Sequence, residues 1–170
     1  MEQPVNAEEQ FLKAYDDFAD AIFRHCFFRI NKNRELAKDL TQETFLRAWT
    51  HIVGGGTIKN IRPFLYKVAS NLIIDSFRGK RPFLMSDMSE RAIEIPVADD
   101  SNKIEFKIEA KKILKILEQI GPIYRDAVLM RYMDDLSPKE IAEILGESEN
   151  AVSVRIHRGI QKLREIIKQV

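Results

Sequence analysis

The chain has 170 residues, of which 45% are hydrophobic and 31% charged, and its formal net charge is +1. This length suits one domain or two small ones, and the composition fits a globular protein rather than a disordered one. No apolar run approaches the roughly 18–20 residues that span a bilayer, and the acidic N-terminus lacks the pattern of a secretion signal. We therefore expect a cytoplasmic protein without membrane insertion. Its single cysteine, Cys26, excludes an intrachain disulfide.

Charge is unevenly distributed along this nearly neutral chain. Residues 1–22 hold six acidic residues against one lysine, which gives this segment a net charge of −5. Residues 58–82 hold six basic residues against one aspartate, a net charge of +5. A basic segment inside an otherwise neutral protein indicates a local site for a polyanion.

Almost every stretch repeats its apolar residues with a helical period, and none shows the sustained alternation of a strand. Three glycines at residues 54–56 interrupt the pattern, and Pro63 suits the first turn of the helix that follows. The pattern predicts an all-α protein with helices at residues 7–30, 34–52, 61–79, 102–119, 122–133, 138–145 and 149–168.

The stretch DLTQETFLRAW, residues 39–49, predicts a helix with two unlike sides. Phe45, Ala48 and Ile52 can face a core. The opposite side carries four residues with the spacing i, i+3, i+4 and i+7: Asp39, Gln42, Glu43 and Leu46. A row of two acids, an amide and a leucine is either an idle solvated face or a surface that binds a partner. Periodicity alone does not distinguish these two interpretations.

The helix expected at residues 61–79 is also two-sided. Its core side is predicted to be Leu65, Val68, Ala69, Leu72 and Ile73. Its other side suits nucleic acid, and comprises Lys67, Asn71, Ile74, Asp75 and Arg78, followed by Lys80 and Arg81. Lysine and arginine can hold phosphates, and an asparagine amide can bond the edge of an unpaired base.

Two features beside this helix allow alternative interpretations. Phe64 and Tyr66 either stack on bases or, as aromatic residues at helical spacing usually do, pack in the core. The glycines at residues 54–56 either approach a ligand backbone closely or form a plain flexible connection. They are not a nucleotide-binding loop, because the lysine-containing phosphate-loop pattern is absent.

Residues 80–101 lack a clean helical period and contain Pro82 and Pro96. Five acids stand against one arginine from residue 84 to residue 101. These features predict an acidic linker, residues 84–101, between an N-terminal helical domain, residues 1–83, and a C-terminal helical domain, residues 102–170.

The C-terminal stretch SPKEIAEILGESENAVSVRIHRGIQKLR, residues 137–164, predicts a helix-turn-helix. Ser137 and Glu140 match a capping box, Gly146 suits a turn with positive φ, and Ser148 can cap the second helix. The expected buried residues of the two helices are Ile141, Ala142, Leu145, Val152, Ile156, Gly159 and Leu163. The preceding helices should support the pair through Ile113, Ile116, Leu117 and Ile120, with Tyr124 and Tyr132 as packing residues.

The exposed face of the second helix is then a candidate DNA-reading surface. It carries Asn150, Ser153, Val154, His157 and Arg158, with Arg155 at its flank. Serine and asparagine bond base edges, valine touches a thymine methyl, and arginine binds guanine or phosphate. The alternative is a three-helix packing unit whose polar face is only solvated.

The chain resembles bacterial RNA polymerase sigma factors in three stretches that follow one another in the same order. These are DLTQETFLRAW, IRPFLYKVASNLIIDSFRGKR and the helix-turn-helix. The resemblance is to the extracytoplasmic-function group, which keeps only regions 2 and 4, and it covers nearly the whole chain. It implies a protein that directs core RNA polymerase to specific promoters and promotes initiation. It also implies no catalysis by the chain itself and no cofactor.

The resemblance further implies roles for the three candidate surfaces. The first would dock on the clamp helices of the polymerase β′ subunit: Asp39, Gln42, Glu43 and Leu46. The second would recognise and help to melt the −10 element: Lys67, Asn71, Asp75, Arg78, Lys80 and Arg81. The third would read the −35 element as duplex: Asn150, Ser153, Val154, Arg155, His157 and Arg158.

Other expectations rest on the same resemblance. The loop before the basic helix would help to hold an extruded non-template base, although the glycines at residues 54–56 are unusual for such a loop. Asn71 and Asp75 occupy positions that match base-holding residues on the helix itself. The acidic linker resembles the segment that threads the RNA-exit path. The expected partners are core polymerase, through the β′ clamp helices and the β flap, promoter DNA and an anti-sigma factor.

Two other classes of protein are to be weighed against this one. A stand-alone helix-turn-helix regulator would share the C-terminal half, but it needs neither the row at residues 39–46 nor the basic helix. A helical enzyme is disfavoured because the adjacent His25 and Cys26 point to different sides of a helix. His51 and His157 lie in separate predicted domains without metal-ligand spacing, so we expect neither a catalytic site nor a metal site.

Overall fold

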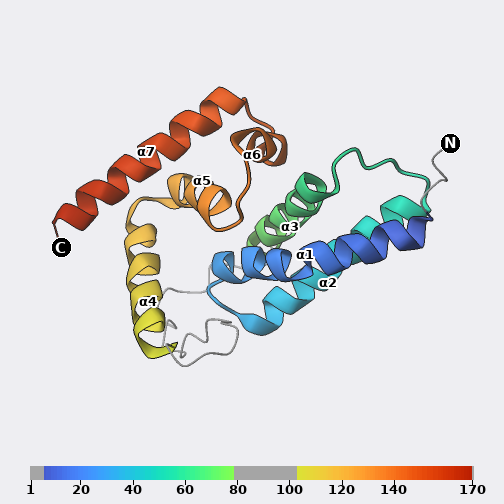
Figure 1. Ribbon diagram of the computed structural model, residues 1–170, viewed down its shortest axis with the longest axis horizontal. Coiled ribbons are helices and arrows are strands. Elements are labelled where there is room, and N and C mark those ends of the chain that lie inside the picture. The colour runs from blue at the N-terminus through green and yellow to red at the C-terminus, as the bar shows by residue number, and fades with distance from the viewer. Residues whose placement is uncertain (1–5, 79–102, 170) are drawn as a thin grey trace. The chain divides into compact units, whose positions relative to one another are not determined.

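The computed structural model describes residues 6–78 and 103–169, with side chains in the second segment from residue 111 onward. Every regular element in these two segments is an α-helix (Figure 1). The helices are α1 Ala7–Arg29, α2 Arg34–Val53, α3 Ile61–Arg78, α4 Lys103–Gln119, α5 Pro122–Tyr132, α6 Pro138–Leu145 and α7 Glu149–Lys168. The predicted fold class is confirmed, and the predicted boundaries are each within one residue of those observed. The predicted linker, residues 84–101, lies outside the described residues.

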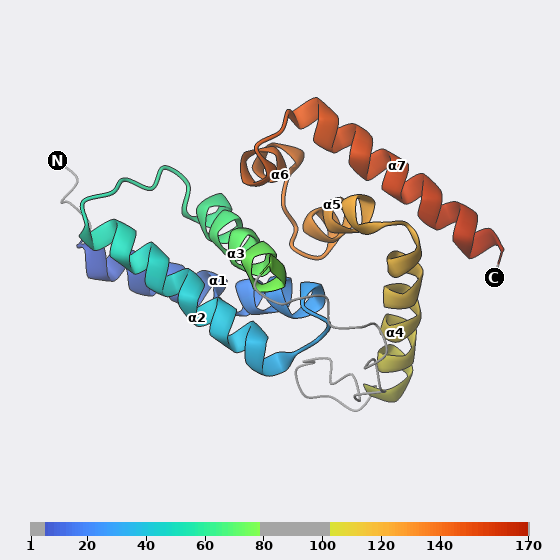
Figure 2. The same ribbon diagram turned by 180° about the vertical axis from the view of Figure 1, so that it is seen from behind.

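Helices α1, α2 and α3 pack against one another within the first of two compact units, and they lie side by side in both views (Figures 1 and 2). Aromatic rings join α1 to α2: the Phe11 ring centroid lies 5.1 Å from that of Trp49, and that of Tyr15 lies 4.9 Å from that of Phe45. Large side chains fill the core of this three-helix unit: Ile22, Phe27, Phe45, Leu65 and Tyr66.

Local chemistry explains where α2 begins and how it tolerates buried threonines. The Asn33 side chain accepts a hydrogen bond from the Leu36 amide at 3.1 Å, which caps the N-terminus. Thr41 and Thr44 are buried, and each hydroxyl donates to the carbonyl four residues earlier at 2.7 Å. These bonds satisfy hydroxyls that would otherwise be costly to bury.

The adjacent His25 and Cys26 are both fully buried on α1. The His25 Nε2 atom lies 3.1 Å from Ser70 Oγ on α3, and the imidazole meets the Tyr66 ring edge-on at a centroid distance of 5.0 Å. Cys26 is therefore a buried core thiol, and His25 joins α1 to α3.

In the second unit, α5 packs against α7, and α4 contacts both. The cluster at their junction is formed by Leu117, Ile120, Val128 and Leu129, with Leu114, Tyr124 and Leu163 packed around it. Gly159 of α7 allows a close approach, because an added Cβ would lie 2.8 Å from Val128 Cγ2 on α5.

Two predictions about this unit were wrong. Ile113 is 57% exposed, and Leu114 packs against the cluster in its place. The apolar arc of α4 is wide enough that periodicity did not show which edge faces α5 and α7. Tyr132 is exposed rather than packed, with the Arg131 guanidinium 5.8 Å from its ring centroid, whereas Tyr124 packs as expected.

The start of the helix-turn-helix has the predicted caps. Ser137 Oγ accepts from the Glu140 amide at 3.2 Å, and a Glu140 carboxylate oxygen accepts from the Ser137 amide at 2.8 Å. Gly146 has φ +67°, a conformation that favours glycine, and this allows the chain to turn between α6 and α7. Ser148 then caps α7 by accepting from the Ala151 amide at 3.1 Å.

Most of the residues predicted to be buried on these two helices are buried. On α6, Ile141 and Ala142 are buried and Leu145 is half-buried, while Ile144 is buried without having been predicted. On α7, the predicted residues Val152, Ile156 and Gly159 are buried. Leu163 is half-buried. None of the described helices combines the length and apolarity needed to cross a membrane.

Candidate functional site

The predicted row on α2 faces solvent. Asp39, Gln42 and Leu46 are exposed, Glu43 is partly exposed, and the Leu46 side chain is 57% exposed. Phe45 and Ala48 on the opposite side are buried, and Ile52 is half-buried. The two-sided pattern read from the sequence is therefore present in the folded helix.

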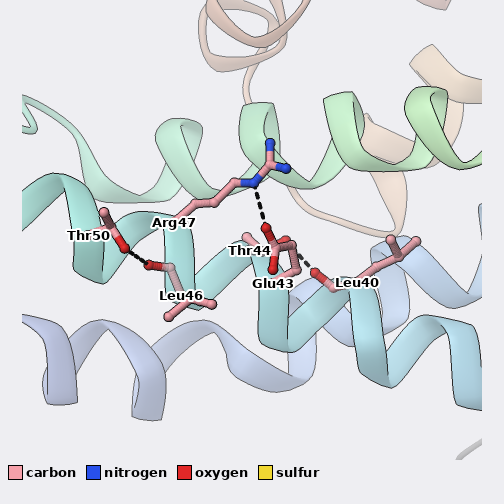
Figure 3. Close-up of polar contacts among 6 residues, drawn as sticks. All are labelled: Leu40, Glu43, Thr44, Leu46, Arg47 and Thr50. Atoms are coloured by element: carbon pink, nitrogen blue, oxygen red, sulfur yellow. Dashed lines mark hydrogen bonds and ion pairs between the residues drawn. The ribbon is translucent and has the colours of Figure 1, made fainter.

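An ion pair fixes the centre of this row (Figure 3). The Arg47 Nε atom donates to Glu43 Oε1 at 2.8 Å, and both side chains are about half exposed. An i,i+4 pair in this position adds only about 0.3–0.5 kcal/mol to stability. Its greater effect is to hold the Glu43 carboxylate in one place beside Leu46. Arg47 was not among the predicted interface residues, although its i+4 spacing from Glu43 was a signal that it would lie there.

Leu46 has no packing role that would account for its position. Its carbonyl accepts from the Thr50 hydroxyl at 2.8 Å, which holds the backbone of this turn (Figure 3), while the apolar side chain is largely exposed. A single exposed leucine is common on protein surfaces. Leu46 differs because it ends a row of polar groups, one of which, Glu43, is held by Arg47. This is the composition of a small contact site with an apolar anchor and a polar rim.

The exposed side of α3 carries the four predicted polar residues that the structure describes: Lys67, Asn71, Asp75 and Arg78. Lys80 and Arg81 lie outside the described residues. The same side also exposes Ile74 and Phe77, which are 49% and 50% exposed. Phe77 was missed, although its i+3 spacing from Ile74 on the polar side was a usable signal. The surface therefore combines two positively charged side chains with apolar side chains that can pack against the rings of nucleobases.

The aromatic residues at the start of α3 have separate roles. Tyr66 is 1% exposed and belongs to the core, so the core alternative, which the helical spacing favoured over base stacking, is confirmed for this residue. Phe64 is half-buried, and its ring centroid lies 5.3 Å from that of His51 on α2. This contact links the end of α2 to the start of α3, on either side of the glycine-containing loop.

Five of the predicted reading residues on α7 are exposed: Asn150, Ser153, Val154, His157 and Arg158. Arg155 is partly buried, because its Nη2 donates to a Glu147 carboxylate oxygen at 2.6 Å. A guanidinium has five N–H donors, so this bond leaves others available while it holds the side chain in place. Sequence reasoning did not identify Glu147, since the pair spans the turn rather than one helix face.

The described residues contain no group of three or more histidine, cysteine, aspartate or glutamate side chains that could hold a metal ion.

Two family models match this chain, one in its N-terminal half and one in its C-terminal half. Residues 14–83 match "Sigma-70 region 2", and residues 110–163 match "Sigma-70, region 4". The chain belongs to the sigma-70 family. The first match contains the exposed faces of α2 and α3, and the second contains the helix-turn-helix.

Relatives and a solved structure agree with this assignment. The extracytoplasmic-function (ECF) RNA polymerase sigma factor SigW of Bacillus subtilis is 29% identical over 176 residues, covering 96% of this chain and 91% of that protein. The ECF sigma factor SigL of Mycobacterium tuberculosis is 29% identical over 166 residues, covering 96% and 93%. The fold resembles that of the sigma factor RpoE of Bartonella quintana, crystallised with the anti-sigma factor NepR, with a TM-score of 0.72, 18% identity and coverage of 94% and 98%.

The protein is thus a sigma factor of the extracytoplasmic-function group, and it acts in promoter-specific transcription initiation with RNA polymerase. Sigma factors are DNA-binding initiation factors rather than enzymes. The alternative of a stand-alone helix-turn-helix regulator is not favoured, because a region 2 match accounts for the N-terminal helices.

Proposed function

We propose that this sigma factor divides initiation among three helices. The α2 row docks on the β′ clamp helices of core polymerase, the α3 surface reads and helps to melt the −10 element, and α7 reads the −35 element as duplex. The observation that carries the proposal is the exposed α2 row, with Leu46 57% exposed beside a carboxylate fixed by Arg47. A protein that bound DNA alone would have no use for that surface.

The proposed clamp contact is a polar row with one apolar anchor. The carboxylates of Asp39 and Glu43 accept hydrogen bonds from basic groups of the partner, and the Gln42 amide both donates and accepts. Leu46 supplies the apolar area that loses water on docking. The charged groups chiefly set partner choice and association rate, while the leucine chiefly slows dissociation.

The proposed −10 contact is electrostatic and stacking in character. Lys67 and Arg78 bind backbone phosphates, and the Asn71 amide bonds the edge of an unpaired base. Asp75 accepts from a base amino group, while its charge disfavours a nearby phosphate. Lys80 and Arg81, which lie outside the described residues, would add two further positive charges to this contact. A strand separated from its complement exposes base rings, which suits the apolar Ile74 and Phe77 on the same side.

The proposed −35 contact lies near the N-terminal half of α7. Asn150, Ser153 and His157 present hydrogen-bonding groups to base edges, and Val154 presents an apolar group. Arg158 reaches guanine or a phosphate. Arg155 contributes a donor that Glu147 has already oriented, so less side-chain freedom is lost when it meets DNA.

Further parts of the proposal rest on family membership. Region 4 would also contact the β flap of core polymerase, and an anti-sigma factor would restrain the free protein, as NepR accompanies RpoE in the crystallised complex. Because its partners are core polymerase and chromosomal DNA, the protein would work in the cytoplasm. We propose no catalysis and no cofactor for the chain itself.

Transcription in vitro with core polymerase on a library of genomic fragments tests the proposal and identifies the promoters together. The expected result is a set of initiation sites that share a −10 and a −35 element and depend on this protein. A parallel gel shift compares the protein alone with the reconstituted holoenzyme. Tight binding of duplex DNA by the protein alone, with no core-dependent initiation, would contradict the proposal.

A further inference from the structure

The loop between α2 and α3 is held in place by contacts at its first residues. The Gly54 amide donates to the Thr50 carbonyl at 3.0 Å, and the Gly56 amide donates to the His51 carbonyl at 2.9 Å. Gly55 has φ +81°, which allows the chain to leave the helix with its amide bonded to the Ile52 carbonyl at 3.1 Å. The glycines therefore end α2 with a defined hydrogen-bonded turn.

The side chain of His51 makes the decisive contact with this turn. A Cβ added to Gly56 would lie 2.6 Å from His51 Cδ2 and closer still to Nε2, so the imidazole lies directly against the Gly56 backbone. The same ring lies 5.3 Å, centroid to centroid, from the Phe64 ring on α3, with a tilt of 38°. The imidazole therefore contacts both the beginning of the loop and the helix at its far end.

The remaining loop residues lie between these two contacts. Thr57, Lys59 and Asn60 are exposed, and the Asn60 carbonyl accepts from the Phe64 amide at 3.3 Å. The three side chains offer hydroxyl, ammonium and amide groups beside the surface that we propose for the −10 element. A loop of this kind selects a base only if its groups are held in position before the base arrives.

We infer that His51 is a positioning residue for −10 recognition: by packing between Gly56 and Phe64, it holds residues 57–60 in the conformation that selects an unpaired base. This inference rests on the proposed −10 function and on the base-holding role that the resemblance implies for the loop before α3. It adds a group on α2 that acts by holding that loop. Gly56 is the residue that the imidazole contacts in the loop, and any side chain there would displace the imidazole. Residue 56 has no positive φ that would demand glycine, so the imidazole is what a side chain there would meet.

The test uses the reconstituted holoenzyme and a promoter found by genomic transcription. Templates are premelted across the −10 element, and each of the four bases is placed in turn at each non-template position. Competition binding gives the discrimination between the preferred base and the others. His51→Ala should lower this discrimination about fivefold at one position, in the range of coupling for residues in direct contact. His51→Phe, which keeps a flat ring against Gly56, should retain the wild-type value within about twofold.

The Gly56→Ala variant makes the test specific to the contact. Alone, it should lower discrimination as His51→Ala does, because its methyl group displaces the ring. In the His51→Ala background the same change should cost nothing more, since the ring that it displaces is gone. Val53→Ala, a truncation of an exposed side chain on the same helical end, is the matched control and should leave discrimination unchanged.

The outcomes separate the inference from the function on which it rests. Wild-type discrimination in His51→Ala, equal loss of binding for all four bases, or additive losses for His51→Ala and Gly56→Ala would each overturn the positioning role. Absence of base discrimination by the wild-type holoenzyme would instead overturn the proposed −10 function of α3. Thermal unfolding of each variant verifies that it is folded, which the exposed position of His51 favours.

Discussion

Replacing Leu46 with alanine should weaken core-polymerase binding without harming the fold. Full burial of a leucine side chain is worth about 1.5–3 kcal/mol. Since 57% of this residue is exposed in the free protein, docking can recover about 1–1.5 kcal/mol, or roughly 5–12-fold in Kd. The free energy of unfolding should change by less than about 0.5 kcal/mol, because the residue is exposed and alanine favours helix.

The assay is titration of core polymerase with labelled sigma factor, with circular dichroism melting of each variant alongside. Leu12→Ala is a matched control, because Leu12 is 53% exposed on α1 and lies outside the proposed row. Its affinity should stay within about twofold of wild type, the scatter expected for a surface substitution away from a contact. Wild-type affinity for folded Leu46→Ala, or an equal loss for Leu12→Ala, would refute the reasoning that places the clamp contact on α2.

Three other predictions concern charge, duplex reading and packing. Glu43→Lys should weaken the same polymerase titration by more than Leu46→Ala does, because it removes the carboxylate and places a second cation beside its former ion-pair partner. Normal affinity in that titration would count against an acidic contact. Arg158→Ala should weaken holoenzyme binding to a −35 duplex by about 1–3 kcal/mol if the contact is to a base, and an unchanged footprint would argue against the α7 surface. Gly159→Ala should lower the free energy of unfolding by about 1–3 kcal/mol through overpacking against Val128. A melt that matches the wild type would show that α5 and α7 can separate at little cost.

Sequence reasoning succeeded where one element carries its own signal. A helix cap depends on residues only a few positions apart, as in the pair Ser137 and Glu140, whose two predicted hydrogen bonds are confirmed. The exposed row on α2 followed from periodicity, because a 3.6-residue repeat places i, i+3, i+4 and i+7 on one side whatever the helix packs against. The turn at Gly146 was equally local, since a positive φ strongly favours glycine.

Sequence reasoning was wrong or left alternatives open where packing against a neighbouring helix determines which side chain is buried. Ile113 and Leu114 are adjacent and both apolar, so only the position of α5 and α7 decides that Leu114 packs and Ile113 does not. For Tyr66 the sequence favoured the core but left a base contact open, and the approach of α1, which brings His25 against its ring, confirms the core.

By itself, the sequence determined the helices of the described residues, the caps and turn of the helix-turn-helix, the polar faces of α2, α3 and α7, and the resemblance to one family. These properties depend on residues within about one or two helical turns of each other. Only the tertiary structure decided that His51 reaches across to Gly56 and Phe64, and that Glu147 orients Arg155. The physical reason is that such contacts depend on the angle and distance at which separate segments meet. The summed packing of many side chains sets those quantities, and no single stretch of sequence encodes them.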